Sequence, residues 1–330
     1  MMVIIIGGRE KYESIVDYLI NKQIPFIVYD AVLDNVNMSN KIRNIQYIGY
    51  DNFFKSTYYI KKHRTISHVI NFRDQCKWLC LEKELLDYYN CNIFTLSDLN
   101  FCSYKSIQDK VCKRLGIPTV PSSGEKIIVK LDSGYSGGTG FFICNNKKAS
   151  TYINNKKFFT QKFLNIDCTI AVYIYVDEKK NWYILNYTKD VYTGDFFPEY
   201  SVTPCFDFDF TCYVKMLSSY LQFTNRLVFW QFVIDKNNNI YSMDFNCRPV
   251  GGFQHGYFDR IISDCDWRKI YLEKITPKSI IYNKKIKLYY KNSDNGNPFN
   301  YKTYRFTCND YYHKLDIPAA NVDLPKLTYS

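Results

Sequence analysis

The sequence of 330 residues predicts an α/β unit followed by an α+β region dominated by antiparallel strands. In the first hundred residues, short apolar runs alternate with amphipathic helical patterns, as in a parallel sheet with crossover helices. From about residue 126, strand patterns follow one another with hairpin-like breaks. The chain is too long for one compact core, so two or three packed units are expected.

In the first unit, apolar runs predict strands over 2–8, 25–30, 68–72 and 91–94, and periodic patterns predict helices over 9–23 and 74–90. Gly7 and Gly8 follow the first strand, but the pattern G-x-G-x-x-G is absent from the sequence. A tight strand-to-helix turn explains these glycines at least as well as a phosphate contact, which argues against a dinucleotide site.

In the second region, a helix over 103–115 is expected to end at Gly116 and Pro118. We predict strands within 126–144, 156–165, 168–176 and 181–196, a helix over 210–223, and a hairpin with strands over 226–235 and 240–247. The tail from Pro277 is basic and rich in tyrosine and shows no motif.

Composition narrows the class of protein. Hydrophobic residues make up 46% and charged residues 23%, an ordinary globular balance, and the net charge is +11. The sequence contains no compact Lys/Arg run, which argues against nucleic-acid binding, the alternative that this charge raises. The twelve cysteines lack C-x-x-C spacing, and Cys80, Cys144 and Cys212 lie in apolar runs, where a thiol acts as a small hydrophobe. The start is too short for a signal peptide and no run approaches a membrane span, so we expect a reduced, cytoplasmic protein without a membrane partner.

The segment "VKLDSGYSGGTGFF" carries the first functional signal. Lys130 ends a strand, and a loop rich in glycine leads to the next strand. Glycines let backbone N–H groups crowd around anionic oxygens, and such a loop can close over a nucleotide. We therefore expect residues 132–140 to form a lid, the alternative being a flexible hairpin in a sheet.

The hairpin that ends in "IYSMDFNCRP" carries the second signal. Strand alternation places Asp244, Asn246 and Arg248 on one face, and the four-residue turn brings Gln231 near Asp244. Carboxylate and amide oxygens suit Mg²⁺ (or Mn²⁺), whose other ligands are typically phosphate oxygens and water. The alternative is an exposed polar row beside one buried, satisfied glutamine.

The order of these motifs resembles the ATP-grasp superfamily, notably its carboxylate–amine and amino-acid ligases and the branch of the carbamoyl phosphate synthetase large subunit. The resemblance covers most of residues 1–275 and implies an N-terminal Rossmann-like (pre-ATP-grasp) domain over 1–100. It further implies a small subdomain with the lid over 101–165, a large subdomain with the metal hairpin over 166–275, and a C-terminal extension over 276–330.

The resemblance assigns roles residue by residue. Lys130 and Arg248 would be catalytic, and Gln231, Asp244 and Asn246 would bind the metal. The residues expected to contact ATP are Lys105, Lys130, Ser136, Gly137, Gly138, Gln161, Lys162, Phe163, Leu164 and Asp167, with Cys168 as a neighbouring alternative to Asp167. Arg73 and His255 are substrate candidates; for Arg73 a helix-start charge pair with Asp74, and for His255 a surface or packing role, are the alternatives.

The implied activity is ATP-dependent ligation of a carboxylic acid to an amine through an acyl phosphate, releasing ADP and phosphate. The partners would be a small-molecule carboxylate and an amine, or a peptide as acceptor. Two departures from the family pattern, Gln161 in place of glutamate and the shorter Asp244, support a second hypothesis. Under that hypothesis the chain is a catalytically degenerate protein that keeps the fold and binds ATP or a partner.

Overall fold

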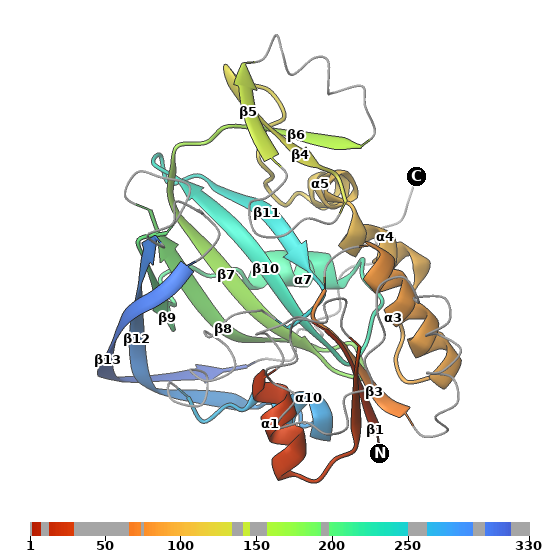
Figure 1. The fold of residues 1–330 in the computed structure, drawn as a ribbon. Helices are drawn as coiled ribbons and strands as arrows, with labels where there is room; N and C mark the ends of the chain where they lie inside the picture. Colours follow the sequence, from red (N-terminus) through yellow and green to blue (C-terminus); the bar gives the residue numbers. More distant parts are fainter. Residues whose placement is uncertain are drawn as a thin grey trace.

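The computed structural model describes residues 2–7, 13–29, 66–73, 76–133, 141–145, 157–192, 198–249, 263–292 and 301–317. The side chains of residues 13, 14, 29, 290–292 and 301–306 lie outside this description. Within it the chain forms three sheets, of which the largest lies at the centre of the molecule (Figure 1).

The N-terminal unit has the parallel sheet that the apolar runs predict. Its strands are β1 (Met2–Ile6), β2 (Phe26–Tyr29) and β3 (Ile66–Asn71), in the order β2-β1-β3. Helices α1 (Glu13–Asn21) and α3 (Cys76–Tyr89) lie within the two predicted helical segments.

The predicted strand over 91–94 is wrong. This segment is irregular, and helix α4 (Leu96–Ser103) begins directly after it. Thr95 and Asp98 form a reciprocal capping box at the start of α4, and the Ile93 N–H donates to Thr224 Oγ1 instead of to a strand.

The second region has the small antiparallel sheet that was predicted. Helix α5 (Lys105–Arg114) leads to β4 (Lys126–Leu131), β5 (Phe141–Asn145) and β6 (Phe158–Lys162), in the order β5-β4-β6. After α5 the chain turns at Gly116, whose φ of +74° favours glycine, and then runs beside the central sheet, where the Ser242 N–H donates to Pro118 O. The small sheet lies above one end of the central sheet, with α5 beside it (Figure 1).

The central sheet has seven strands in the order β11-β10-β7-β8-β9-β12-β13. They are β7 (Ile166–Val176), β8 (Trp182–Val191), β9 (Tyr200–Thr203), β10 (Arg226–Asp235), β11 (Ile240–Asn246), β12 (Ser279–Asn292) and β13 (Tyr301–Asp316). The predicted hairpin is therefore present as β10 and β11. The tail without a motif contributes two long strands to the same sheet.

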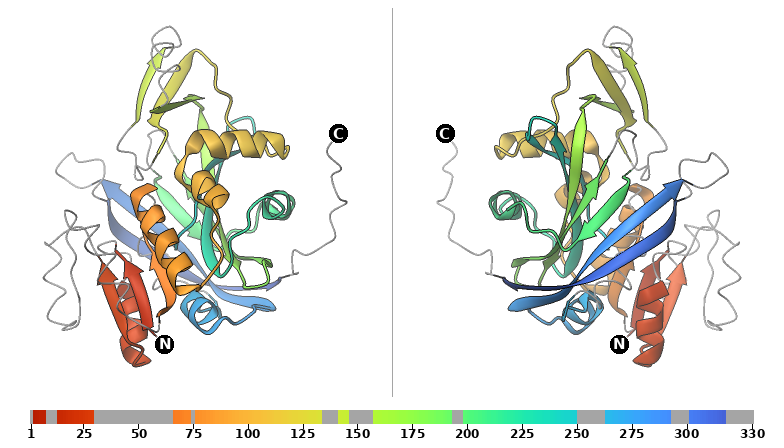
Figure 2. Two further views of the ribbon diagram at one scale, coloured as in Figure 1. Left: turned by 90° about the vertical axis from the view of Figure 1, so that its right-hand side faces the viewer. Right: turned by 90° about the vertical axis from the view of Figure 1, so that its left-hand side faces the viewer.

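Alternate residues of the central strands enter two different cores. Ile170, Val172 and Ile174 of β7 pack in a core that includes α3, α4 and α7 (Thr211–Ser218). Ala171 and Tyr173 point to the opposite face, toward a core that includes α1, α10 (Trp267–Glu273) and β12. The side views show α7 on one side of the sheet (Figure 2).

All twelve cysteines are free thiols. The expectation that Cys80 and Cys212 act as small core hydrophobes is wrong, because both are exposed, Cys80 on α3 and Cys212 on α7. None of the helices in the described part of the chain has both the length and the apolar character required to cross a bilayer.

Candidate functional site

Lys105 is the first residue of α5, and its position is set by the end of β4. The Lys105 N–H donates to Asp132 O, and both the N–H and the hydroxyl of Ser106 donate to the Asp132 carboxylate at 2.7 Å. Asp132 thus caps the helix from outside it, because Tyr104, the residue before the helix, makes no side-chain cap bond. This contact, which sequence analysis missed, joins the first turn of α5 to Asp132, the first residue of the predicted lid.

Lys130 lies half-buried near the end of β4, and its Nζ donates to Gln161 Oε1 at 2.8 Å. Burial lowers the pKa of the Lys130 ammonium to about 8; the Asp244 carboxylate raises this pKa and the Lys105 ammonium lowers it further. Lys105, Lys130 and Asp244 are therefore close enough to interact electrostatically. The two lysines supply concentrated positive charge, which suits a polyphosphate.

The hairpin places the three predicted metal ligands together. Gln231 of β10 pairs directly with Asp244 of β11, as the turn length predicted, and Asn246 follows two residues later. The register shifts immediately beyond this pair, with Met243 as the extra residue, and such bulges often re-aim side chains next to functional sites. Asp244 Oδ1 lies 4.0 Å from Lys105 Nζ, so the hairpin faces the start of α5.

The side-chain amides of the hairpin are oriented by protein acceptors. Asn246 Nδ2 donates to Asp244 Oδ2 at 3.1 Å, and Gln231 Nε2 donates to Thr169 Oγ1 at 3.3 Å. In each amide, the oxygen consequently points away from the hydrogen bond that the nitrogen donates. Together with the Asp244 carboxylate, these oxygens are a donor set that fits a hard divalent cation.

Gln108 of α5 binds the backbone of Phe245, the residue between Asp244 and Asn246. Its Nε2 donates to Phe245 O at 2.9 Å, and its Oε1 accepts from the Phe245 N–H at 3.2 Å. The glutamine is 8% exposed, so both bonds are shielded from water. Sequence analysis missed this residue, because a glutamine inside a polar helical pattern does not stand out.

A buried ion pair holds the residue that follows β11. Arg226 NH2 lies 2.9 Å from Glu82 Oε1, and Arg226 NH1 donates to Cys247 O at 3.2 Å. Asn71 Nδ2 donates to Glu82 Oε2 at 3.0 Å, and the guanidinium also lies 4.0 Å from the centre of the Phe94 ring. Burial raises the pKa of Glu82, while Arg226 and Asn71 act in the opposite direction. The network connects β3 and α3 to the peptide between Asn246 and Arg248.

The resemblance places residues 161–164, here called the hinge, against the adenine of ATP, and this segment runs from the end of β6 toward β7. Gln161 is buried, and the Lys162 and Phe163 N–H groups donate to Pro121 O at 2.6 Å and to Lys126 O at 2.8 Å. Two of the three hinge N–H groups are thus already used within the protein, and Leu164 is the third. Asp167 is exposed at the start of β7, whereas the neighbouring Cys168 is buried in the core.

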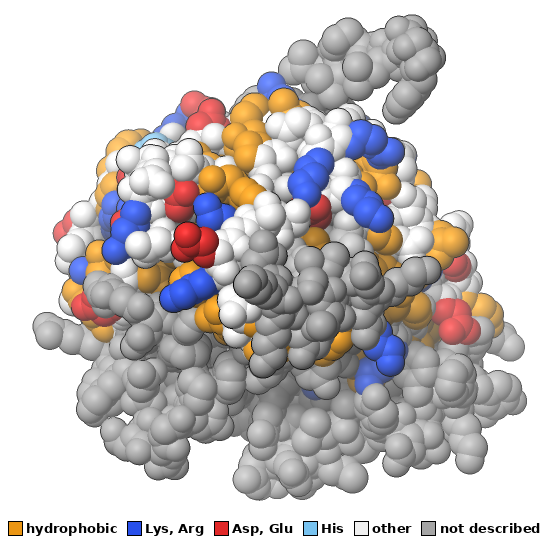
Figure 3. Space-filling view, turned by 90° about the horizontal axis from the view of Figure 1, so that it is seen from above, with side chains coloured by type: hydrophobic (Ala, Val, Ile, Leu, Met, Phe, Trp, Pro, Cys, Tyr) orange, Lys and Arg blue, Asp and Glu red, His pale blue; other side chains and the backbone are white. Residues whose placement is uncertain are grey.

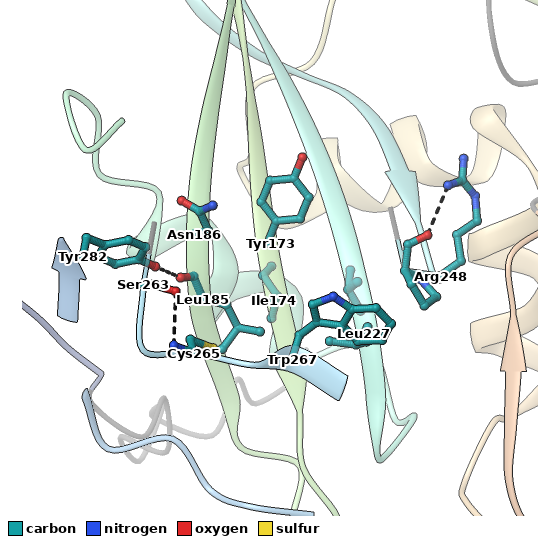
Figure 4. Close-up of a pocket in the computed structure, with 12 residues that line it drawn as sticks. Tyr173, Ile174, Leu185, Asn186, Leu227, Arg248, Ser263, Cys265, Trp267 and Tyr282 are labelled. Carbon is teal, nitrogen blue, oxygen red and sulfur yellow. Dashed lines mark hydrogen bonds between the residues drawn. The ribbon is translucent and has the colours of Figure 1, made fainter. Parts of the chain in front are cut away.

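A pocket of about 40 Å³ lies beside Arg248 (Figure 4). Its wall residue Tyr173 is on the same sheet face as Ala171, the strand partner of Gln231, so the pocket opens on the face that carries Gln231 and Asp244. Its walls are mainly apolar and aromatic, and they include Tyr173, Leu227 and Trp267. Arg248 is 7% exposed, and its NH1 donates to Pro249 O. The volume is enough for a few water molecules or a group as small as a carboxylate.

Of the two substrate candidates, Arg73 lies two residues after the end of β3, and its N–H donates to Asn71 Oδ1 at 2.8 Å. Arg73 is therefore attached to the Glu82–Arg226 network. His255, Ser136, Gly137 and Gly138 lie outside the described residues, so their roles stay predictions.

The face of the molecule above the small sheet carries mixed charge. In Figure 3, which looks down on the small sheet, lysine and arginine side chains are scattered among acidic and apolar ones. In the described ranges, no three His, Cys, Asp or Glu side chains cluster as a metal site. The donor set of the hairpin is of a different kind, because two of its three members are amides.

The sequence matches no protein-family model and no curated protein. The fold does match solved structures. An N5-carboxyaminoimidazole synthetase from Staphylococcus aureus is 16% identical, with a TM-score of 0.67 over 88% of this chain and 82% of that chain. A biotin carboxylase from Campylobacter jejuni is 16% identical (TM-score 0.63, 87% of this chain, 75% of that chain). An L-amino acid ligase from Bacillus licheniformis is 11% identical (TM-score 0.64, 88% of this chain, 79% of that chain). These solved structures are ATP-grasp enzymes, so the α/β and α+β units of this chain together form the ATP-grasp fold.

Proposed function

We propose that the protein is an ATP- and Mg²⁺-dependent ligase that joins a carboxylic acid to an amine through an acyl phosphate. The observation that carries this proposal is the approach of Lys105, Lys130 and Asp244, which belong to α5, β4 and β11. Solved structures of the same fold support it, since two are described as complexes with ADP and a third as a complex with MgADP.

In the proposed reaction, a carboxylate oxygen attacks the γ-phosphorus of ATP, the bond to the β,γ-bridging oxygen breaks, and ADP leaves. The amine then attacks the acyl carbon, expels phosphate and loses a proton. Lys105 and Lys130 would hold the phosphates, Arg248 would stabilise the transferring phosphoryl group, and Leu164 N–H is the hinge donor we assign to the adenine. Asp167 would contact the ribose.

Gln231, Asp244 and Asn246 would hold Mg²⁺ (or Mn²⁺), which when bound would offset negative charge on the phosphates. The narrow pocket beside Arg248 supports a position for the acid's carboxylate next to the phosphoryl group. The partners would be a small-molecule acid and an amine, or a peptide as acceptor.

A second candidate is an ATP-binding protein that lacks turnover. The bond from Lys130 to the neutral Gln161 favours it, because a glutamate at that position would stabilise the lysine charge more strongly. The two candidates differ in one measurement, since only the ligase releases ADP when an acid and an amine are added.

The test is a screen of acid and amine pairs that reads out released ADP and phosphate and then product mass. The double variant Asp244→Ala, Asn246→Ala should abolish turnover and leave the far-UV circular dichroism unchanged. Asn237→Ala is the matched control, because this exposed residue lies in the turn of the same hairpin. Unchanged ADP release in the double variant would refute the metal assignment.

A further inference from the structure

A second concentration of positive charge lies on the other face of the central sheet. A hollow of about 310 Å³ is lined by Lys189, Lys285 and Lys287. One carboxylate, that of Asp207, lies at its edge and accepts a hydrogen bond from the Cys205 thiol. The other lining residues include Tyr200, Val202, Thr307 and Asn309. All three lysines are half-buried at this site, which distinguishes them from freely solvated surface lysines. They come from β8 and β12, and β9 and β13 complete the floor.

Strand register brings the three lysines together. Lys189 pairs with Val202 of β9, and Val202 pairs in turn with Lys287 of β12, so these residues form one row across the sheet. Lys287 then pairs with Thr307, and Lys285 pairs with Asn309. Two strand spacings separate Lys189 from Lys287 by about 10 Å, and two residues along β12 separate Lys285 from Lys287 by about 7 Å.

Aromatic rings hold each ammonium group beside the hollow. Lys287 Nζ lies 3.6 Å from the centre of the Tyr200 ring, Lys285 Nζ lies 5.3 Å from that of Tyr311, and Lys189 Nζ lies 5.8 Å from that of Phe208. Such contacts favour the charged amine and restrict its side chain. The cations are therefore already in position before any anion arrives.

The hollow is separate from the proposed nucleotide site. Gln231 shares its sheet face with Thr169, which contacts Asp190, and Lys189 points to the opposite face because successive residues of a strand alternate. By the same alternation, Lys284 points away from Lys285 on β12, and Lys284 is ion-paired with Asp310.

We propose that this hollow binds the di- or triphosphate group of a small molecule. Three preformed cations against the single Asp207 carboxylate leave a net positive charge that attracts such a group, and Thr307 and Asn309 add uncharged hydrogen-bonding side chains at the edge. The site goes beyond the proposed ligase activity, because neither the acid, the amine nor the catalytic ATP is needed at this face.

The test uses the full-length protein and sodium tripolyphosphate as the probe. Lysine acetylation, read residue by residue by mass spectrometry, reports this site separately from Lys105 and Lys130. We expect Lys189, Lys285 and Lys287 to become protected at one common tripolyphosphate concentration, with Lys284 unchanged.

The double variant Lys189→Gln, Lys287→Gln should weaken protection of Lys285 by roughly five-fold to twenty-fold, because the phosphate loses two partly exposed ion pairs. The matched control Lys284→Gln, on the same strand, should leave protection of Lys285 unchanged. Three results would overturn the site. They are protection of Lys284 equal to that of the three lysines, no protection at millimolar tripolyphosphate, and unchanged affinity in the double variant. Protection by a 5′-phosphorylated oligothymidylate but not by tripolyphosphate would overturn its assignment to a small molecule.

Discussion

Replacing Glu82 by glutamine should destabilise the fold by about 3–5 kcal/mol, because the change leaves a buried guanidinium without its counter-charge. Arg226 is 5% exposed and Glu82 is 3% exposed, so water cannot compensate for the lost carboxylate. The glutamine keeps the shape of the side chain. The loss therefore reports the charge and not a cavity.

The entropy of unfolding for a chain of this length is about 0.7 kcal/mol per kelvin, so a loss of about 4 kcal/mol should lower the melting temperature by roughly 6 °C. Urea unfolding followed by tryptophan fluorescence measures the free energy directly, with the buried Trp182 and Trp230 as reporters. Replacing both partners (Glu82→Met with Arg226→Met) should recover much of the loss, since no charge then stays buried.

The control is Lys83→Gln on the same helix. Lys83 pairs with Asp87 at 2.8 Å, but the Asp87 side chain is 56% exposed, so the expected cost is at most about 0.5 kcal/mol. If Glu82→Gln costs no more than this control, Glu82 is uncharged in the folded protein and the argument from an ion pair is wrong.

Three further predictions concern α5 and β4. Lys130 is charged below its pKa of about 8 and neutral above it, so affinity for MgATP should be constant below about pH 7 and fall by up to about ten-fold per unit above pH 8. Calorimetric titrations from pH 6.5 to 9.5 measure this, and a fall that persists in Lys130→Arg would contradict it. Gln108→Leu should lower the free energy of unfolding, measured in urea, by about 2 kcal/mol or more, because it leaves the buried N–H and C=O of Phe245 unpaired. A loss below about 0.5 kcal/mol would refute the role of these two hydrogen bonds. Asp132→Ala should lower the free energy of unfolding by about 1 kcal/mol and weaken MgATP binding. Asp132→Asn still accepts from Ser106 and should retain most of the stability and most of the affinity. Equal losses in the two variants would speak against capping.

Local patterns in the sequence predicted strands, helices and the hairpin, which depend on neighbouring residues. The alternation in "IYSMDFNCRP" and the length of the Asn-rich turn predicted a hairpin that pairs Gln231 with Asp244, and the structure confirms this pair. The segment 91–94 was mistaken for a strand, although Thr95 and Asp98 have the spacing of a capping box and predict a helix start instead.

Contacts between distant parts of the sequence could not be predicted in this way. Glu82 and Arg226 are each unremarkable in their own segments, and their pairing depends on how α3 packs against β10. The strands of the tail are likewise recognisable only beside β9, because β12 and β13 share the tyrosine-rich and lysine-rich composition of the whole chain.

The bond pair between Gln108 and Phe245 has a consequence for strand alignment. A slip of β11 by one residue along β10 would exchange its two faces and turn Asp244 and Asn246 toward the interior. Gln108 grips the backbone of the one residue that separates them, from a helix whose first residue is Lys105. Helix α5 therefore stabilises one alignment of β11. The same helix presents Lys105, a phosphate-binding lysine in our proposal, so strand alignment and lysine position are fixed together.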